Sequence, residues 1–114
     1  MSKLFSIVLV ISLHFSLAWA QGTTSGTILG TVQDSTGAVL PGAEVTATHL
    51  DTATSRTVIS NDEGRYVVSN LSLGNYEIVV SLPGFQTAVR TGIEITIGRR
   101  AVLNFTLTVG SITE

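Results

Sequence analysis

The sequence predicts an all-β protein, a sandwich of seven short strands, and three observations support this fold class. The segments after Ala20 are short, rich in Val, Ile, Thr, Tyr and Phe, and separated by turn residues. Several of them alternate apolar and polar residues, which is the pattern of a strand with one buried face. No stretch after Ala20 keeps a helical period. Seven strands in about ninety residues are typical of a small two-sheet sandwich.

Residues 1–20 have the organisation of a cleavable signal peptide. Lys3 precedes an apolar run at 4–17, and the small-residue pattern Ala18-Trp19-Ala20 stands directly before Gln21. The run is shorter than the roughly 18 apolar residues that a membrane-spanning helix needs. We therefore expect cleavage after Ala20 and export of the remaining chain as a soluble protein.

The composition of the exported chain excludes several classes of function. Five arginines stand against eight acidic residues, which gives a net charge of −3 after Ala20 and no basic tract. Nucleic acid is therefore not an expected partner. The sequence contains no cysteine, which excludes disulfides, a lipoprotein anchor, thiol catalysis and cysteine–zinc sites. Stability must come from the apolar core.

The first two expected strands follow a flexible N-terminal segment at 21–26. They cover 27–34 and 43–49, and they are separated by turn residues at 34–37 and by the Pro-Gly pair at 41–42. Alternation places every second side chain on the inner face. The inward residues expected from these strands are Ile28, Gly30, Val32, Val45 and Ala47.

The next two strands, 56–60 and 65–69, flank the turn sequence Asn-Asp-Glu-Gly at 61–64. We expect them to form a hairpin in which Gly64 adopts a left-handed conformation, because glycine accepts a positive φ without steric cost. The same alternation turns Tyr66 and Val68 inward.

Three further strands complete the sandwich, at 76–82, 93–97 and 103–107, and an exit segment follows at 109–114. The Pro-Gly pair at 83–84 ends the first of them. The residues expected to face inward are Tyr76, Ile78, Val80, Leu82, Ile93, Ile95, Ile97, Leu103, Phe105 and Leu107.

Catalytic constellations lack the residues that they need. His49 is the only histidine after Ala20, so one chain cannot form a two-histidine zinc site, and Thr52 stands where a His-x-x-Glu motif requires glutamate. No serine lies in a Gly-x-Ser-x-Gly elbow. We expect His49 at the surface or a sheet edge, and we expect no enzymatic activity, no catalytic residue and no cofactor.

A weak calcium site is the one metal alternative. Asp62 and Glu63 are adjacent carboxylates, and a neighbouring loop could add Asp34 or Asp51. No EF-hand spacing supports such a site, and solvated turn carboxylates are the favoured interpretation. No metal ligand is therefore assigned.

Carbohydrate binding would require exposed rings on which sugars can stack. Four aromatic residues follow Ala20, and alternation places Tyr66, Tyr76 and Phe105 inside. Phe85 is the only ring whose placement the pattern leaves undecided, and a plug at the end of a sheet is the favoured interpretation. The ligand-binding residues remain unassigned.

Five turn-centred motifs occur along residues 27–108. They are Gly30-Thr31-Val32-x-Asp34-x-x-Gly37, Leu40-Pro41-Gly42-Ala43-x-Val45, Asn61-Asp62-Glu63-Gly64-Arg65-Tyr66, Leu71-x-x-Gly74-x-Tyr76 and Gly84-Phe85. Together they resemble the carboxypeptidase regulatory-like domain over residues 27–108. The resemblance implies a Greek-key sandwich of the transthyretin-like, prealbumin type, with seven or so strands.

The resemblance implies no activity for this chain. In carboxypeptidases this domain accompanies a separate zinc-binding catalytic domain, and the sequence contains no such domain. Related pilin-like modules form Lys–Asn isopeptide bonds, but the only lysine here is Lys3. The related fold that hydrolyses hydroxyisourate ends in a characteristic motif, which residues 111–114 do not match.

The resemblance also implies a cellular context. In Gram-negative bacteria, TonB-dependent outer-membrane receptors carry this domain after the signal peptide and before the plug and barrel, and this chain is similar to the start of such a receptor. We expect a periplasmic or outer-membrane-associated binding or assembly module, which is a receptor extension, a fragment or a stand-alone copy. Its partner is then another protein or the remainder of the receptor. The alternative is a starch-binding-like carbohydrate module.

Overall fold

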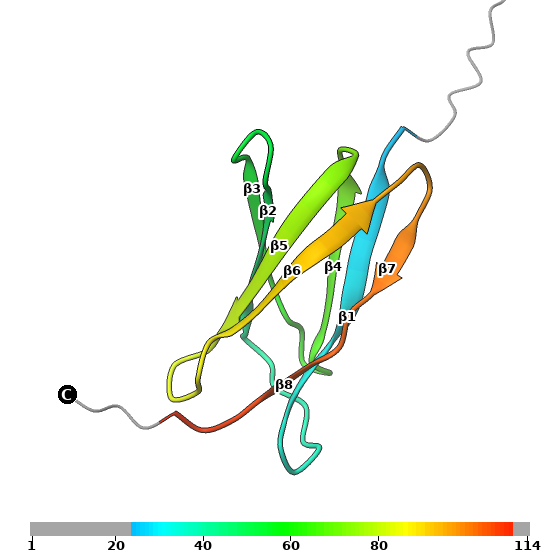
Figure 1. Ribbon diagram of the computed structural model, residues 1–114. Helices are drawn as coiled ribbons and strands as arrows, with labels where there is room; N and C mark the ends of the chain where they lie inside the picture. Colours follow the sequence, from blue (N-terminus) through cyan, green and yellow to red (C-terminus); the bar gives the residue numbers. More distant parts are fainter. Residues whose placement is uncertain (1–23, 111–114) are drawn as a thin grey trace, which may run out of the picture.

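The computed structural model describes residues 24–110, which form two four-stranded β-sheets packed as a sandwich (Figure 1). The predicted signal peptide at 1–20, most of the segment at 21–26 and residues 111–114 lie outside the described residues. Within 24–110 there is no helix that could span a membrane. The strands are β1 (Gly26–Asp34), β2 (Glu44–His49), β3 (Ser55–Ile59), β4 (Arg65–Leu71), β5 (Gly74–Ser81), β6 (Ala88–Ile95), β7 (Arg100–Val102) and β8 (Phe105–Leu107).

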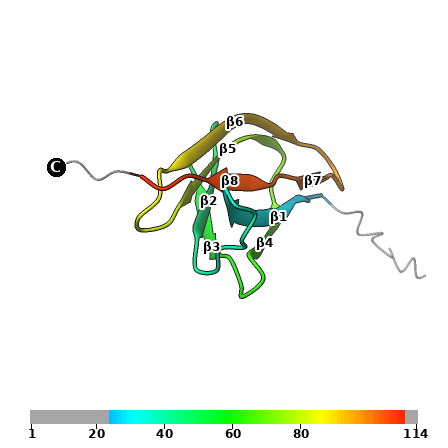
Figure 2. The same ribbon diagram turned by 90° about the horizontal axis from the view of Figure 1, so that it is seen from below.

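Strand β1 is the centre of the first sheet. It pairs with β4 in antiparallel fashion on one side and with β7 and then β8 in parallel fashion on the other. Figure 2 shows β7 and β8 following one another beside β1. The second sheet has the order β3-β2-β5-β6, and all its pairs are antiparallel.

The core lies between the two sheets and consists of the side chains that alternate inward. Burying an aliphatic or aromatic side chain of this kind contributes about 1.5–3 kcal/mol, so the core supplies the stability that a cysteine-free chain needs. Twelve of the residues predicted to face inward are buried here: Ile28, Val32, Val45, Ala47, Tyr66, Val68, Tyr76, Ile78, Val80, Ile95, Phe105 and Leu107.

The predicted hairpin between residues 56–60 and 65–69 is wrong, although its turn is present. Strand β3 pairs with β2, whereas β4 pairs with β1, so the chain crosses from one sheet to the other at 61–64. Asn61 Oδ1 accepts the backbone N–H groups of Glu63 and Arg65 at 2.9 and 3.0 Å. The Gly64 carbonyl accepts the Val32 N–H at 2.7 Å, which anchors this turn on β1.

Gly64 has the predicted left-handed conformation, with a φ of 75°. A second constraint acts at the same position, because a Cβ atom would lie 2.7 Å from the Val32 carbonyl oxygen. The crossing between the sheets therefore requires glycine for both its backbone conformation and its close packing.

The strand predicted at 93–97 begins earlier and ends earlier than expected. It is β6, which starts at Ala88 and ends at Ile95, and this leaves Ile97 67% exposed instead of buried. Gly92 lies within β6 at a φ of 78°, and the register of β6 on β5 shifts nearby. The predicted alternation holds after this irregularity, since Ile93 packs against the core and Ile95 is buried, and it fails at Ile97 because the strand has already ended.

The strand predicted at 103–107 begins only at Phe105, and the unpredicted strand β7 precedes it, so residues 24–110 form eight strands instead of seven. Leu103 and Asn104 separate β7 from β8. The Tyr66 hydroxyl donates to the Leu103 carbonyl at 2.6 Å, and Asn104 Oδ1 accepts the Thr31 N–H at 3.0 Å. Side chains thus supply the hydrogen bonds that a continuous ladder would have formed.

Two arginines bridge the lateral openings between the sheets. From β3, Arg56 donates to the carbonyls of Ser69 and Asn70 at the end of β4, at 2.6 and 3.1 Å. From β6, the Arg90 guanidinium lies 4.7 Å from the centre of the Phe105 ring of β8. These two cations are therefore engaged within the fold.

Candidate functional site

His49 is buried and structural, which corrects the prediction that it lies at the surface. It is 5% exposed, and its Nδ1 accepts the backbone N–H groups of Asp51 and Thr52 at 3.2 and 3.3 Å. Nδ1 is therefore the acceptor of the ring, and Nε2–H donates to the Leu73 carbonyl at 2.8 Å. Its ring packs edge-on against Tyr76 with centroids 5.0 Å apart. Both nitrogens are occupied by the fold, so neither is free to act as a base or metal ligand.

The carboxylates considered for calcium do not form a cluster. Within residues 24–110 there is no group of three or more His, Cys, Asp or Glu side chains that could hold a metal ion. Asp34 is the last residue of β1 and Asp51 lies in the turn between β2 and β3, and the end of β1 and this turn are at opposite ends of the sandwich (Figure 1). Asp62 and Glu63 are exposed in the turn that joins the sheets. The arrangement therefore does not support a calcium site.

Asp34 is instead engaged in its own turn. Its Oδ1 accepts the Thr36 hydroxyl at 2.7 Å and the backbone N–H groups of Thr36 and Ala38 at 2.9 and 3.0 Å. These hydrogen bonds, that from the Thr36 hydroxyl above all, hold the pKa of Asp34 below its ordinary value. Accepting three donors favours the charged carboxylate. This carboxylate stabilises a loop and is not a candidate catalytic acid.

Tyr66 is the other titratable group with a displaced pKa. Burial raises the pKa of its hydroxyl far above the ordinary value, and the charge of Arg90 acts in the opposite direction. The hydroxyl is therefore neutral and serves as a donor to the Leu103 carbonyl.

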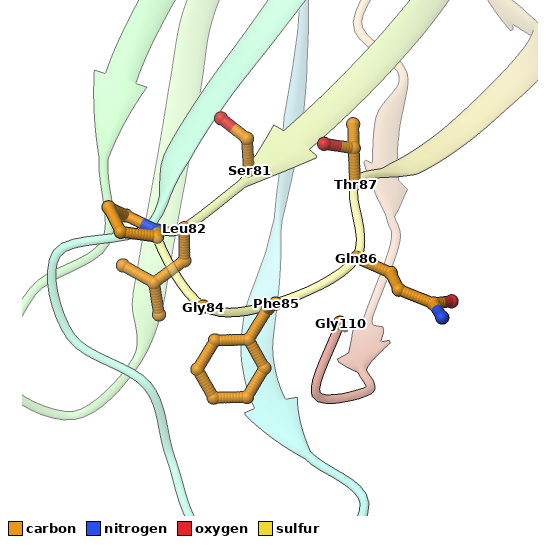
Figure 3. Close-up of a pocket in the computed structure, with 8 residues that line it drawn as sticks. Ser81, Leu82, Gly84, Phe85, Gln86, Thr87 and Gly110 are labelled. Carbon is orange, nitrogen blue, oxygen red and sulfur yellow. The ribbon is translucent and has the colours of Figure 1, made fainter. Parts of the chain in front are cut away.

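Phe85 lines an open pocket of 440 Å³ at the end of the sandwich where the chain leaves β8 (Figure 3). The lining comes from residues 81–87 and Gly110, and none of these residues has a titratable side chain. Phe85 is half-buried and packs against the core, as the plug interpretation predicts. The other rings considered for sugar stacking, Tyr66, Tyr76 and Phe105, are each 2% exposed. Within the described residues, no pair of exposed rings offers the platform that a carbohydrate site would need.

Residues 108–110 are fixed to the rim of this pocket. The Thr108 carbonyl accepts the Gln86 N–H at 2.8 Å, and the Gly84 carbonyl accepts the Gly110 N–H at 3.0 Å. These bonds hold residues 108–110 against the loop that follows β5.

The outer side of the first sheet carries a more distinctive arrangement, which we call the basic face. Leu29 of β1 lies between Val67 of β4 and Val102 of β7, because the register pairs Leu29 with both. Val67 is 53% exposed and Val102 is 63% exposed. Arg65 precedes Val67 by two residues and Arg100 precedes Val102 by two residues, so both arginines share the outer side of the sheet with the apolar row. They lie on opposite flanks of the row, because β4 and β7 run in opposite directions.

An open groove of 290 Å³ follows the apolar row. Its lining includes Leu29, Val67 and Val102, together with Thr31, Arg65 and Asn104 at the gap between β7 and β8. The interruption of the last strand and the apolar row therefore meet at one place on the surface. Isolated exposed aliphatic residues are ordinary, but a contiguous row beside a groove is typical of a contact surface.

The outer side of the second sheet has a different chemistry, and we call it the threonine face. The Thr46 and Thr57 hydroxyls lie 3.0 Å apart, and those of Thr48 and Ser55 lie 2.9 Å apart. Glu44 and Glu77 alternate with the inward side chains of β2 and β5 and so belong to this side. These hydroxyls satisfy one another across the strands.

The sequence profile of the carboxypeptidase regulatory-like domain matches residues 27–108 of this chain. The chain belongs to this family. The match has the same bounds that the turn motifs predicted, and the two-sheet sandwich confirms the fold expected from them. No curated protein matches the sequence.

Solved structures share the fold of this regulatory-like domain at low sequence identity. The Bacillus anthracis TIE protein is 22% identical with a TM-score of 0.64, over 75% of this chain and 17% of its own. Catechol 1,2-dioxygenase of Acinetobacter radioresistens is 13% identical with a TM-score of 0.63, over 84% of this chain and 55% of its own. Chlorocatechol 1,2-dioxygenase of Pseudomonas putida is 14% identical with a TM-score of 0.63, over 75% of this chain and 61% of its own. The chain spans less than two thirds of each of these structures, and the likeness shows the fold alone.

Proposed function

We propose that this regulatory-like domain is a non-catalytic, exported binding or assembly module, which works as the N-terminal extension of a TonB-dependent outer-membrane receptor or as a fragment or separate copy of one. The observation that carries the binding role is the apolar row beside its groove, in which half-buried Leu29 lies between exposed Val67 and Val102. An apolar surface of this kind is stabilised when a partner covers it.

The chemistry of the titratable groups supports the non-catalytic part of the proposal. His49 uses both ring nitrogens in hydrogen bonds to the backbone, and Asp34 accepts three donors of its own turn. His49 and Asp34 are thus engaged in holding loops. Family membership adds support, since the domain is known as an accessory to other domains.

The export and receptor context is tested by fractionation and by sequencing. The chain is expressed with its own N-terminus in a Gram-negative host, and a variant lacking residues 1–20 is the control. We expect the full chain in the periplasmic or outer-membrane fraction with Gln21 as its new N-terminus, and the control in the cytoplasm. The coding DNA downstream of Glu114 in the native genome then distinguishes the alternatives, since a plug and barrel encoded there would identify a receptor extension, and their absence a fragment or separate copy. Retention of the uncleaved chain in the cytoplasm would contradict the proposal.

The binding role is tested by comparison with the carbohydrate alternative. Affinity electrophoresis on soluble glucans measures retardation of the purified domain. We expect none, because Phe85 is half-buried and stands without a second exposed ring among residues 24–110. Strong retardation on any glucan would replace the protein-binding proposal with the carbohydrate one.

A further inference from the structure

We propose that the basic face binds an acidic polypeptide segment that presents one aliphatic side chain between two carboxylates. The inference rests on the proposed binding role and specifies the surface and the chemistry of the partner. It places the aliphatic side chain in the groove over Leu29 and the carboxylates on Arg65 and Arg100.

The apolar row supplies the central contact. Val67, Leu29 and Val102 lie side by side on three neighbouring strands, so their side chains form one continuous strip across the sheet. The groove of 290 Å³ opens at this strip. Covering the row with an aliphatic side chain removes apolar surface from water, which favours binding.

The charges on this face select an acidic partner. Arg65 has one ion pair, with Glu63 at 3.8 Å, and both side chains are about 70% exposed, at 68% and 71%. Such a pair contributes little and leaves the guanidinium open to another carboxylate. Arg100 makes no ion pair within the described residues. Asp34 is the only carboxylate on the strands of this sheet, and its Oδ1 is held by Thr36 and Ala38.

The other arginines of the strands do not compete for this role. Arg56 donates to the carbonyls of Ser69 and Asn70, and Arg90 lies against the Phe105 ring at the opposite opening. Both face the interior side of their strands, because Arg56 is opposite Ala47 and Arg90 is opposite Ile78. The free cationic groups on the strands are therefore gathered on one outer face.

The spacing of the two arginines indicates a polypeptide and not a single small anion. Arg65 is paired with Thr31 and Arg100 with Thr27, on opposite sides of β1. Four residues along a strand and two strand spacings across it separate their Cα atoms by about 16 Å. When both side chains stand away from the sheet, as strand side chains do, one carboxylate does not bridge the two guanidinium groups. In an extended segment, residues i, i+2 and i+4 share one side and span about 13 Å, so two glutamates flanking a leucine fit this diagonal.

The test is an NMR titration of the ¹⁵N-labelled exported chain with the peptide Ser-Glu-Thr-Leu-Thr-Glu-Ser. We expect amide shifts at Leu29, Val67 and Val102, and binding that weakens as salt rises. Val67→Glu should weaken binding about tenfold or more, because the new charge replaces an apolar contact and repels the peptide carboxylates. The matched control is Val89→Glu on β6, since Val89 is 55% exposed and Val67 is 53% exposed. The control should bind as the original chain does.

A second variant, Arg65→Gln with Arg100→Gln, keeps the apolar row. We expect peptide binding by this variant to lose most of its dependence on salt concentration. A peptide with lysines in place of the glutamates should not bind the original chain. Shifts on Thr46 and Thr57 instead of the basic face would overturn this inference and leave the binding role in place. Equal binding of laurate would overturn the polypeptide assignment. Concentration-dependent shifts without peptide would assign the face to a second copy of the chain. The fractionation described above tests the proposed function separately.

Discussion

On the outer side of one sheet, three aliphatic side chains form a row beside two open arginines, whereas on the outer side of the other sheet threonine hydroxyls bond to one another. Both surfaces follow the same period of two along their strands. The difference lies in how the outward groups are arranged. On the threonine face, hydroxyls pair across the strands, and Glu44, Glu77 and the 55% exposed Val89 lie among them, whereas the basic face gathers its apolar row and two arginines in one place.

The largest expected loss of stability comes from a substitution that separates part of the basic face from the rest of the fold. A Cβ atom at Gly30 would lie 1.9 Å from the Leu103 carbonyl oxygen, so Gly30→Val should separate the β7–β8 connection from β1. We expect a loss of about 3 kcal/mol or more in the free energy of unfolding, measured by urea denaturation. The comparison variant is Gly92→Val on β6, where a φ of 78° causes strain but the space is open. Equal losses for the two would contradict the account.

The next effect concerns the crossing between the two sheets. Gly64 and Gly37 both have a positive φ, at 75° and 91°, but only Gly64 packs against backbone atoms of β1. Gly64→Val should therefore cost about 1–3 kcal/mol more than Gly37→Val, since it adds a clash to the same backbone strain. Thermal unfolding of both variants measures the difference. Identical melting temperatures would show that the close packing of this turn on β1 does not contribute to stability.

A smaller loss of stability is expected when a single hydroxyl group is removed, and its size should differ between the buried Tyr66 under the basic face and Thr46 on the threonine face. Tyr66→Phe removes the donor to the Leu103 carbonyl and leaves that acceptor without its side-chain partner, so we expect a loss of about 1–2 kcal/mol. Thr46→Val removes an exposed hydroxyl pair with Thr57 and should change stability by less than about 0.5 kcal/mol. Chemical denaturation of the two variants tests this order, and the reverse order would be inconsistent with it.

The smallest effect is a dependence on pH. Hydrogen bonds hold the pKa of Asp34 below its ordinary value of 3.8, so the carboxylate stabilises the folded chain above that value. This contribution is lost as the pH falls through the folded pKa, where the carboxylate is protonated. Asp34→Asn should therefore lower the melting temperature at neutral pH and leave a flatter curve between about pH 5 and pH 2. Parallel curves for the variant and the original chain would contradict the role given to Asp34.

Strands with regular alternation were predictable from the sequence. Tyr76, Ile78 and Val80 repeat every second residue and are all buried, and Tyr66 and Val68 follow the same rule. The chemistry of the turn at Gly64 was also predictable, since a left-handed position next to Asn and Asp favours glycine. Local rules of this kind need no knowledge of the partner strand.

Pairing between strands was not predictable in the same way. The turn at 61–64 has the composition of a hairpin loop, but the two flanking strands belong to different sheets because the turn packs on Val32 of β1. The gap at Leu103 and Asn104 likewise depends on Tyr66 and Thr31, which are distant in sequence. Long-range contacts decide these features, and a single sequence does not display them.

The candidate site illustrates both cases. His49 continues the alternation of Ala43, Val45 and Ala47, and this signal placed it inward, against the expectation that a lone histidine lies at the surface. The basic face depends on the register that brings Val67, Leu29 and Val102 together from three strands. No sequence spacing displays that register, so these residues were missed.

Accessibility in the native assembly tests the central claim most directly. The chain contains no cysteine, so Val67→Cys and Val89→Cys each introduce a single thiol at nearly equal exposure, 53% and 55% for the original side chains. A maleimide reagent should label the two purified variants at similar rates. In intact cells, the account predicts that the cysteine on the basic face is protected by its partner and that the cysteine on β6 is labelled as before. Equal labelling of both in cells, or protection of β6 alone, would contradict it.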